Sequence, residues 1–155
     1  TGDAGYLKDG ELYLKERIKD LFKTSNGKYI APQMVESMML VDKYVDQVAV
    51  VADQRKFVSA LVVPEFRLLE QWADDHGVKY DSREALCQSK KVNKMIMERL
   101  ETLQQGLASY EQVKRITLLP HHFSMENGEL TNTLKLKRGV VYKNYKDIID
   151  KMYEE

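Results

Sequence analysis

Residues 45–65 read VDQVAVVADQRKFVSALVVPE, two valine-rich runs joined by a short polar segment. Valine is frequent in strands because its branched side chain packs well on a pleated surface, whereas the polar segment Asp53–Lys56 is typical of a turn. The pattern predicts two adjacent strands, at 45–53 and 56–65. We expect these strands to form the core of a sheet.

The segments on both sides of these strands carry helix signals. Apolar residues recur at helical spacing from Val92 to Leu107, so one face of that segment is apolar and the other is polar. Pro32 is expected to begin a short helix, because proline fits the first helical position. Pro64 is expected to begin another helix, which Gly77 ends. The remaining predicted elements are a helix capped by Asp81 and Glu84, a strand at 112–120 and one amphipathic helix from Val141 to Met152.

Two hairpins are predicted before the first helix. In the first, Asp9 and Gly10 form the turn between two short apolar runs. In the second, the Thr-Ser-Asn-Gly segment at 24–27 forms the tip, which requires the free backbone of Gly27. Strands and helices that mix without strict alternation indicate an α+β fold, in which helices pack on a small central β-sheet and a short β-hairpin precedes it.

Composition limits the classes of function. A chain of 155 residues can bury one sizeable core. Its 24 Lys and Arg residues balance its 24 Asp and Glu residues, which argues against a general polyanion binder, so nucleic acid is not expected as a partner. The single Cys87 cannot form an internal disulfide and is expected to have a packing role in a reduced setting. A single cysteine also favours the reduced setting of the cytosol, so a cytoplasmic location is expected. No apolar run approaches the roughly 18 residues that a membrane span needs.

Several candidate sites are set aside. The adjacent His121 and His122 lie at the end of a predicted strand, where neighbouring side chains point to opposite faces, so no metal site is predicted there. The acidic pair at 74–75 precedes His76 at a helix end and is interpreted as a solvated face. The sequence contains neither a Walker-type loop nor a Gly-x-Gly-x-x-Gly motif, so it offers no known phosphate cradle of its own.

Three further segments are informative because of their order and spacing. They are TGD at 1–3, ERIKDLFKTSNGKYIAPQMVE at 16–36 and GELTNTLKLKR at 128–138. Together they resemble the C-terminal part of the adenylate-forming superfamily, and within it the AMP-forming long-chain fatty acyl-CoA synthetases. The resemblance covers essentially the whole chain, and the LTxTxKLKR form of the last segment is similar to the long-chain branch. One departure is Asn132, where long-chain relatives commonly have proline, which relaxes the loop without removing a functional group.

The resemblance implies a domain organisation and a reaction. Residues 1–18 would be the tail of an N-terminal adenylation domain, residues 19–155 would be the C-terminal capping domain, and the chain would be a piece of a longer protein. In this family a fatty acid attacks the α-phosphate of ATP to give acyl-AMP and pyrophosphate, and CoA then displaces AMP. ATP with Mg would be bound mainly by the N-terminal domain, which is the expected partner, and CoA would enter as a substrate. The isolated domain is expected to be inactive, and the whole enzyme could also touch a membrane surface peripherally.

The resemblance also assigns residues. Lys135 matches the catalytic lysine of the adenylation step, in which a fixed ammonium holds the carboxylate and the α-phosphoryl oxygens together and offsets their charge. Lys19 falls at the hinge about which the capping domain rotates between two orientations. After the rotation the second hairpin would line the path of the CoA thiol. The other assigned residues are Asp3 and Arg17 at the nucleotide and Ser25, Asn26 and Gly27 at the CoA tunnel.

Alternatives to this interpretation stay open. The acid could be a medium-chain or aryl carboxylate, because the acyl pocket would lie in the N-terminal domain. The chain could instead be a non-catalytic module that binds a polyanion through Lys135, Lys137 and Arg138, in which case binding would weaken steeply with salt. It could also serve only as a scaffold, and a Lys135→Ala substitution would then leave the activity of the intact protein unchanged.

Overall fold

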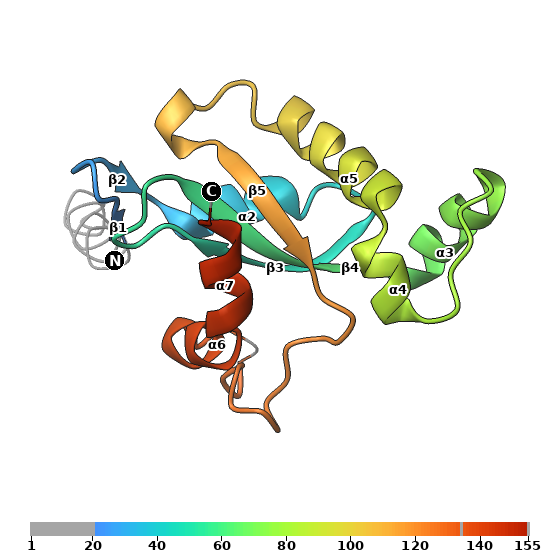
Figure 1. Cartoon of the computed structure of the whole chain (residues 1–155). Helices are drawn as coiled ribbons and strands as arrows, with labels where there is room; N and C mark the ends of the chain where they lie inside the picture. Colours follow the sequence, from blue (N-terminus) through green and yellow to red (C-terminus); the bar gives the residue numbers. More distant parts are fainter. Residues whose placement is uncertain (1–20, 134, 155) are drawn as a thin grey trace, which may run out of the picture.

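A three-stranded sheet forms the centre of the fold, and a two-stranded hairpin lies beside it (Figure 1). Strand β4 (Val58–Pro64) is central in the sheet. Strand β3 (Val45–Val51) pairs with it in antiparallel orientation, and strand β5 (Val113–Leu118) pairs with it in parallel orientation. The three predicted strands and the α+β class are therefore confirmed.

The computed structural model describes residues 21–133 and 135–154. The first predicted hairpin lies outside the described residues, as do the assigned residues Asp3, Arg17 and Lys19. Among the residues that are described, no helix is both long enough and apolar enough to cross a membrane.

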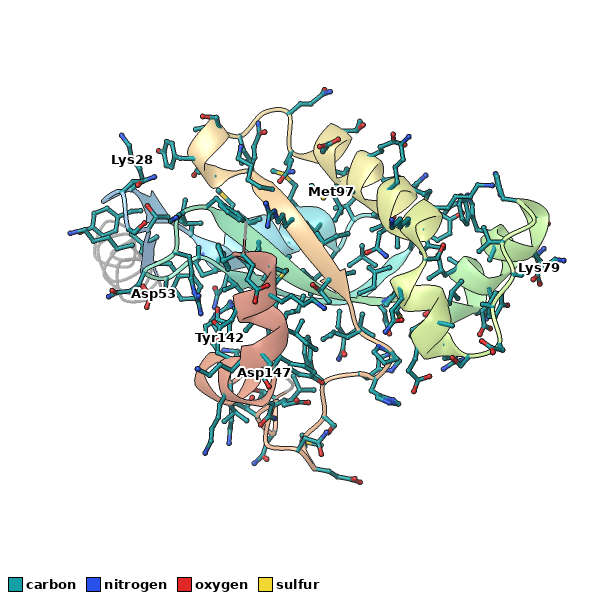
Figure 2. The ribbon with its side chains drawn as sticks, viewed as in Figure 1. Lys28, Asp53, Lys79, Met97, Tyr142 and Asp147 are labelled. Atoms are coloured by element: carbon teal, nitrogen blue, oxygen red, sulfur yellow. The ribbon has the colours of Figure 1, made fainter. Side chains whose placement is uncertain are left out.

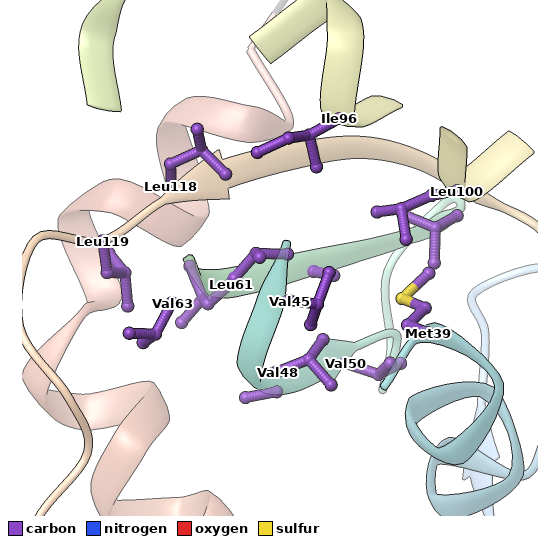
Figure 3. Close-up of a cluster of buried hydrophobic side chains, with 14 of the residues drawn as sticks. Met39, Val45, Val48, Val50, Leu61, Val63, Ile96, Leu100, Leu118 and Leu119 are labelled. Atoms are coloured by element: carbon purple, nitrogen blue, oxygen red, sulfur yellow. The ribbon is translucent and has the colours of Figure 1, made fainter. Parts of the chain in front are cut away.

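The hydrophobic core surrounds β4. Every residue of β4 is buried, and a strand that is covered on both faces reads as a continuous apolar run rather than as an alternating one. Figure 3 shows Leu61 of β4 among buried side chains from the neighbouring strands and from helices α2 (Pro32–Met39) and α5 (Lys90–Leu103). Leu61 and Leu100 are both fully buried. Burial of such a side chain contributes about 1.5–3 kcal/mol, so this core is the main source of stability.

Helices cover the two faces of the sheet. α2 and α5 contact each other and pack against β3 and β5, respectively, while α7 (Lys146–Met152) lies on the opposite side (Figure 1). On the α7 side, Ser59 Oγ donates to the Tyr153 hydroxyl at 2.9 Å, and Arg115 Nη1 donates to the Met152 carbonyl at 2.6 Å. Ser59 and Arg115 are register partners in neighbouring strands, so their side chains point to the same face. These contacts fix the end of α7 to the sheet.

Helix α3 (Phe66–Asp75) begins later than predicted. Pro64 does not begin it, because Pro64 is the last residue of β4. The pairing there is irregular between Val45 and Gln47, and a proline without an amide hydrogen is tolerated at such a place. The helix ends before Gly77 as predicted, and the φ of 70° at Gly77 is the left-handed conformation that often follows a helix.

Helix α4 (Arg83–Gln88) has a different cap from the one predicted. Ser82, not Asp81, has the extended backbone of an N-cap, and its hydroxyl accepts a hydrogen bond from Ala85 N at 3.0 Å. Serine and aspartate are comparable as caps. Residue type alone therefore could not separate these two neighbours.

The last predicted helix is in fact two helices. α6 (Arg138–Asn144) and α7 meet at Tyr145, whose φ of −114° lies outside the helical region. The two helices contact different strands: the Tyr142 hydroxyl of α6 donates to the Val50 carbonyl of β3 at 2.6 Å, whereas α7 lies against β5. The prediction of one continuous helix was wrong because the apolar spacing continues across the break.

Candidate functional site

The segment that contains the assigned catalytic lysine is a tight loop rather than a strand. Its strand-like part is a single bridge between Leu130 and Leu136. Inside that bridge, Thr131 N donates to the Lys135 carbonyl at 2.8 Å, and Lys135 N donates to Thr131 Oγ1 at 3.1 Å. Thr131 Oγ1 also lies 3.0 Å from Thr133 Oγ1. The backbone of Lys135 is therefore held by its own loop, while the residue is exposed to solvent.

A buried carboxylate supports this loop. Glu129 is 1% exposed, and its carbonyl accepts a hydrogen bond from Lys137 N at 2.8 Å. Its carboxylate accepts hydrogen bonds from Ser124 N at 3.2 Å and from Asn144 Nδ2 at 3.1 Å. Burying a carboxylate is costly unless such donors satisfy it, so Glu129 fixes the loop to α6. Burial, followed by the charge of Glu129, raises the pKa of Tyr145.

An ion pair fixes the end of the loop. Arg138, the first residue of α6, donates from Nη1 to Glu36 Oε2 at 2.5 Å and from Nη2 to Glu36 Oε1 at 2.8 Å. Burial alone would lower the pKa of Arg138, but the hydrogen bonds and the charge of Glu36 raise it. The guanidinium also lies over the ring of Phe22, 5.6 Å from the ring centroid. Arg138 therefore anchors the loop and begins the last helical region.

The side chains of Glu36 and Tyr142 complete the hydrogen bonds of Val50 on the outer edge of β3. Val50 N donates to Glu36 Oε2 at 2.8 Å, and the Val50 carbonyl accepts from the Tyr142 hydroxyl at 2.6 Å. Unpaired groups on an edge strand invite pairing with other chains, and these two side chains close the edge at Val50. Burial raises the pKa of Tyr142 far above its ordinary value.

Sequence reasoning missed Glu36, Glu129 and Tyr142. A signal for Glu36 was present, because it lies three residues before Met39, a buried residue on the same face of α2. A charged residue on an apolar helix face is rarely buried without a partner of opposite charge. This rule would have predicted that a cation from elsewhere in the chain pairs with Glu36. Glu129 had no comparable signal, because it lies in a polar loop.

The second predicted hairpin is confirmed as β1 (Phe22–Lys23) and β2 (Tyr29–Ile30), which pair in antiparallel orientation. Gly27 in its turn has a φ of 83°, a left-handed conformation that favours glycine. No atom lies within 4 Å of the position that a Cβ of Gly27 would take, so the space beside this backbone is open. Ser25 N donates to the Arg55 carbonyl at 2.9 Å, which holds the tip against the turn between β3 and β4.

The tip of this hairpin is exposed and lies away from the lysine loop. Asn26 Nδ2 donates to the Lys56 carbonyl at 3.4 Å, and Ser25 and Gly27 beside it are exposed. Phe22 at the base of the hairpin contacts Arg138, but Figure 1 shows the tip between β1 and β2 extending away from the loop before α6. The structure therefore does not bring Lys135 together with the three hairpin residues. It presents them on two separate surfaces.

Other titratable residues form no joint centre in the part of the chain that the structure describes, where no three His, Cys, Asp or Glu residues could hold a metal ion. His121 Nε2 lies 3.8 Å from a Glu84 carboxylate oxygen, and His122 contacts Asp46, so the two rings turn to different carboxylates. Cys87 is buried, and burial followed by the charge of Glu84 raises the pKa of its thiol to about 12. This thiol is a poor nucleophile near neutral pH.

Comparison with curated proteins relates this chain to one part of longer enzymes. It is 40% identical to long-chain-fatty-acid–CoA ligase 1 of Homo sapiens over 157 residues, which cover 99% of this chain and 22% of that protein. It is 41% identical to long-chain-fatty-acid–CoA ligase 5 of Rattus norvegicus over 158 residues, which cover 99% of this chain and 23% of that protein. The chain thus spans about a fifth of the length of these relatives.

Solved structures share the fold. The adenylation domain of a carboxylate reductase from Mycobacterium chelonae matches with a TM-score of 0.73 at 24% sequence identity, covering 90% of this chain and 20% of that chain. At this identity the match shows a common fold and nothing more. The family model described as AMP-binding enzyme C-terminal domain matches residues 19–155. The chain therefore belongs to the family of AMP-binding enzyme C-terminal domains.

Proposed function

We propose that this chain is the C-terminal part of an AMP-forming long-chain fatty acid CoA ligase, with residues 1–18 as the tail of the N-terminal adenylation domain and residues 19–155 as the capping domain. The identity of 40% to the human ligase over 99% of the chain supports this proposal. The parent enzyme would convert ATP, a fatty acid and CoA to acyl-CoA, AMP and pyrophosphate, by way of acyl-AMP. The isolated domain would be inactive.

Lys135 is the proposed adenylation residue. In the first half-reaction a carboxylate oxygen of the acid attacks the α-phosphorus of ATP, and the bond from that phosphorus to pyrophosphate breaks. Negative charge is crowded at the α-phosphoryl oxygens during this step. A fixed ammonium that touches the carboxylate and these oxygens lowers the barrier, because it holds the reactants together and offsets their charge. Lysine suits this role as a compact point charge.

One observation carries this assignment: Lys135 is exposed, yet its backbone is held in place. Hydrogen bonds with Thr131 close the loop around it. The buried Glu129 and the ion pair between Arg138 and Glu36 fix the loop to the rest of the fold. A charge that is already in position stabilises a transition state without reorganisation during the reaction. An ordinary surface lysine would not need such support.

The hairpin tip is the proposed lining of the thiol tunnel. In the second half-reaction the CoA sulfur attacks the acyl carbonyl carbon, and the bond from that carbon to AMP breaks. Ser25, Asn26 and Gly27 suit a narrow passage because the space beside the backbone of Gly27 is open. This tip and Lys135 occupy separate surfaces, which suits a domain that presents one surface in each half-reaction.

The other proposed roles fall on residues outside the described part of the chain. Lys19 would be the hinge of the rotation, Asp3 would accept hydrogen bonds from the ribose hydroxyls, and Arg17 would face the nucleotide. ATP with Mg would be held mainly by the N-terminal domain. We further propose a cytoplasmic location for the parent enzyme, with peripheral contact at a membrane where fatty acid is collected.

The test uses the parent enzyme and fatty-acid-dependent exchange of pyrophosphate into ATP, which reports the first half-reaction alone. Lys135→Ala is expected to lower the exchange rate by about 10²–10³-fold, the loss typical of removing one preorganised charge. Lys137→Ala is the matched control, because Lys137 is also exposed and lies two residues away. Its exchange rate is expected to stay within about twofold of the wild type. Equal losses in the two variants, or no loss in either, would contradict the assignment.

The acid class is tested by the same exchange reaction. The names of the relatives suggest a long-chain acid, so palmitate is expected to give a higher kcat/KM than octanoate or benzoate. A preference for octanoate or benzoate would favour the alternative of a medium-chain or aryl acid ligase. That result would leave the role of Lys135 intact.

A further inference from the structure

A groove runs along the outer edge of β5. Residues of the strand line its floor, and residues of α5 and α7 line its walls. Figure 1 shows β5 between these two helices. Helix α4 lines a further part of it through Cys87 and Gln88. The groove has a volume of about 870 Å³, which lies within the range of pockets that hold ligands.

The backbone of β5 faces this groove. Leu119 N donates to the Val62 carbonyl of β4 at 2.8 Å, and the backbone groups of successive residues in a strand point in alternate directions. The amide and carbonyl groups of Leu118 and Ile116 therefore point away from β4. Among the described residues, no group outside the sheet forms a hydrogen bond with these amides and carbonyls.

Two other positions on the edges of the sheet are closed by side chains. Val50 in β3 has its amide bound by Glu36 and its carbonyl bound by Tyr142. Val113 at the start of β5 has both backbone groups bound by the Gln104 side chain, at 2.8 and 3.0 Å. Native proteins close exposed edges because open edges pair with other chains. An open stretch inside a walled groove is therefore suited to strand addition.

The interior of the groove is apolar. Met97 extends from α5 on the side of β5 (Figure 2). Ile116 lies on the floor, and Ile148 and Met152 line the α7 wall. Two walls with apolar side chains can receive the alternating side chains of an extended segment, which point to opposite sides of its backbone.

The rim of the groove is basic. Lys94, Lys114, Arg115 and Lys151 line it, against the single carboxylate of Glu84. Within residues 21 to 154, position 134 excepted, no carboxylate forms an ion pair with any of the three lysines. The chain as a whole is neutral, so this concentration of cations is local and complements an anionic ligand.

We propose that this groove binds an extended acidic segment of a partner protein, which adds as a strand to the edge of β5. Its backbone would exchange hydrogen bonds with Ile116 and Leu118, its apolar side chains would contact the two walls, and its carboxylates would pair with Lys94 and Lys151. A fatty acid or an anionic lipid would match the charge and the apolar floor. Neither ligand would form the strand hydrogen bonds with the amides and carbonyls of Ile116 and Leu118. A peptide fits better because it pairs with these groups.

The experiment measures binding of a fluorescein-labelled peptide, Asp-Asp-Val-Ile-Val-Ile-Asp-Asp, to the 155-residue chain by fluorescence anisotropy. A second peptide with the same side chains carries N-methyl groups on alternate residues, which removes the amide hydrogens of one edge. The methylated peptide is expected to bind at least about tenfold more weakly, because it loses strand hydrogen bonds. In NMR spectra the amides of Ile116 and Leu118 are expected to gain protection from hydrogen exchange when the unmodified peptide binds.

Charge variants test whether the basic rim contributes to peptide binding. The double variant Lys94→Glu and Lys151→Glu is expected to bind the unmodified peptide at least about tenfold more weakly. Lys79→Glu is the matched control, because Lys79 is exposed at the far end of the molecule (Figure 2), and it is expected to bind like the wild type. Circular dichroism checks that all variants are folded.

Three results would overturn the proposal. One is equal binding of the two peptides, which would mean that charge alone attracts them. Another is displacement of the peptide by laurate or by anionic vesicles with no change at Ile116 and Leu118, which would favour a lipid ligand. The last is self-association of the chain that the double charge variant abolishes, which would make the groove an interface between two copies.

Discussion

Arg138 and Glu36 are separated by 102 positions in the sequence, and two hydrogen bonds of 2.5 and 2.8 Å join them in the fold. Glu36 also binds the amide of Val50 on the edge of β3. The loop that carries Lys135 ends at Arg138, so this ion pair fixes the position of the loop relative to the sheet. A buried ion pair contributes little net stability compared with apolar packing, but breaking one leaves an uncompensated charge. The role of this ion pair is therefore to hold the Lys135 loop in place rather than to add net stability.

Removal of one partner of this pair should destabilise the fold strongly. Arg138→Met leaves the carboxylate of Glu36 buried with only the amide of Val50 as a donor. The free energy of unfolding is expected to fall by about 3–5 kcal/mol, measured by urea denaturation. Arg138→Lys is expected to recover only part of this loss, because an ammonium cannot form the two parallel hydrogen bonds.

An exposed ion pair supplies the control for this prediction. Arg67 and Glu65 lie 3.8 Å apart, and the Arg67 side chain is 87% exposed. Arg67→Met should change the free energy of unfolding by less than about 0.5 kcal/mol. Similar losses for Arg138→Met and Arg67→Met would mean that the pair with Glu36 does not hold the loop.

Thr131 is expected to act as a positioning residue for Lys135. Thr131→Val keeps the shape of the side chain but removes the oxygen that accepts the amide hydrogen of Lys135. We expect a loss of no more than about 1 kcal/mol in stability. In the parent enzyme, kcat of the adenylation step should fall about tenfold with little change in KM, because the affected interaction is made in the transition state. Thr131→Ser should restore the rate, and wild-type kinetics for Thr131→Val would rule out this role.

Gly27 should matter for the second half-reaction. Gly27→Ala places a side chain on a backbone with a φ of 83°, which costs about 1 kcal/mol. The methyl group also narrows the open space at the tip, so thioester formation from acyl-AMP is expected to slow while adenylation stays near the wild-type rate. Gly106→Ala is the matched control, because a Cβ at Gly106 also meets no atom and its φ is not left-handed. If both variants slow both steps equally, the hairpin does not line the thiol path.

Cys87 should make stability depend on pH. The pKa of its thiol is about 12 in the folded chain and about 8.5 in an unfolded chain. Between these values the unfolded chain has lost the proton that the folded chain keeps, so the free energy of unfolding falls as pH rises. The contribution of Cys87 is complete below about pH 8.5 and declines by up to about 1.4 kcal/mol per pH unit above it.

The measurement compares urea denaturation of the wild type and Cys87→Ala, under reducing conditions, at about pH 8, 9 and 10. The wild type should lose stability more steeply than the variant over this range. Parallel curves would show that the thiol is not shielded from solvent as its burial implies.

The elements that the sequence predicted well are those with local signals. The valine-rich runs became β3 and β4, Pro32 begins α2, and Gly27 takes the left-handed turn of the second hairpin. In each case the signal lies within a few residues of the element. A short stretch of sequence therefore contains the physical reason for the structure.

The features that were missed depend on distant contacts. Nothing near Arg138 in the sequence points to Glu36, and nothing near Tyr145 shows that α6 and α7 contact different strands. The segment at 128–138 forms a loop whose strand-like part is only the bridge between Leu130 and Leu136. Lys135 was found from the motif at 128–138 and not from a local structural signal. Its support by Glu129 became visible only in the fold.

Lys135 is expected to serve the adenylation step alone. The most direct test compares Lys135→Ala with the wild type in the parent enzyme, for acyl-AMP formation and, separately, for thioester formation from preformed acyl-AMP. The variant is expected to lose about 10²–10³-fold in the first step and to keep a rate within about threefold of the wild type in the second. Survival of both steps, or equal loss of both, would contradict this expectation.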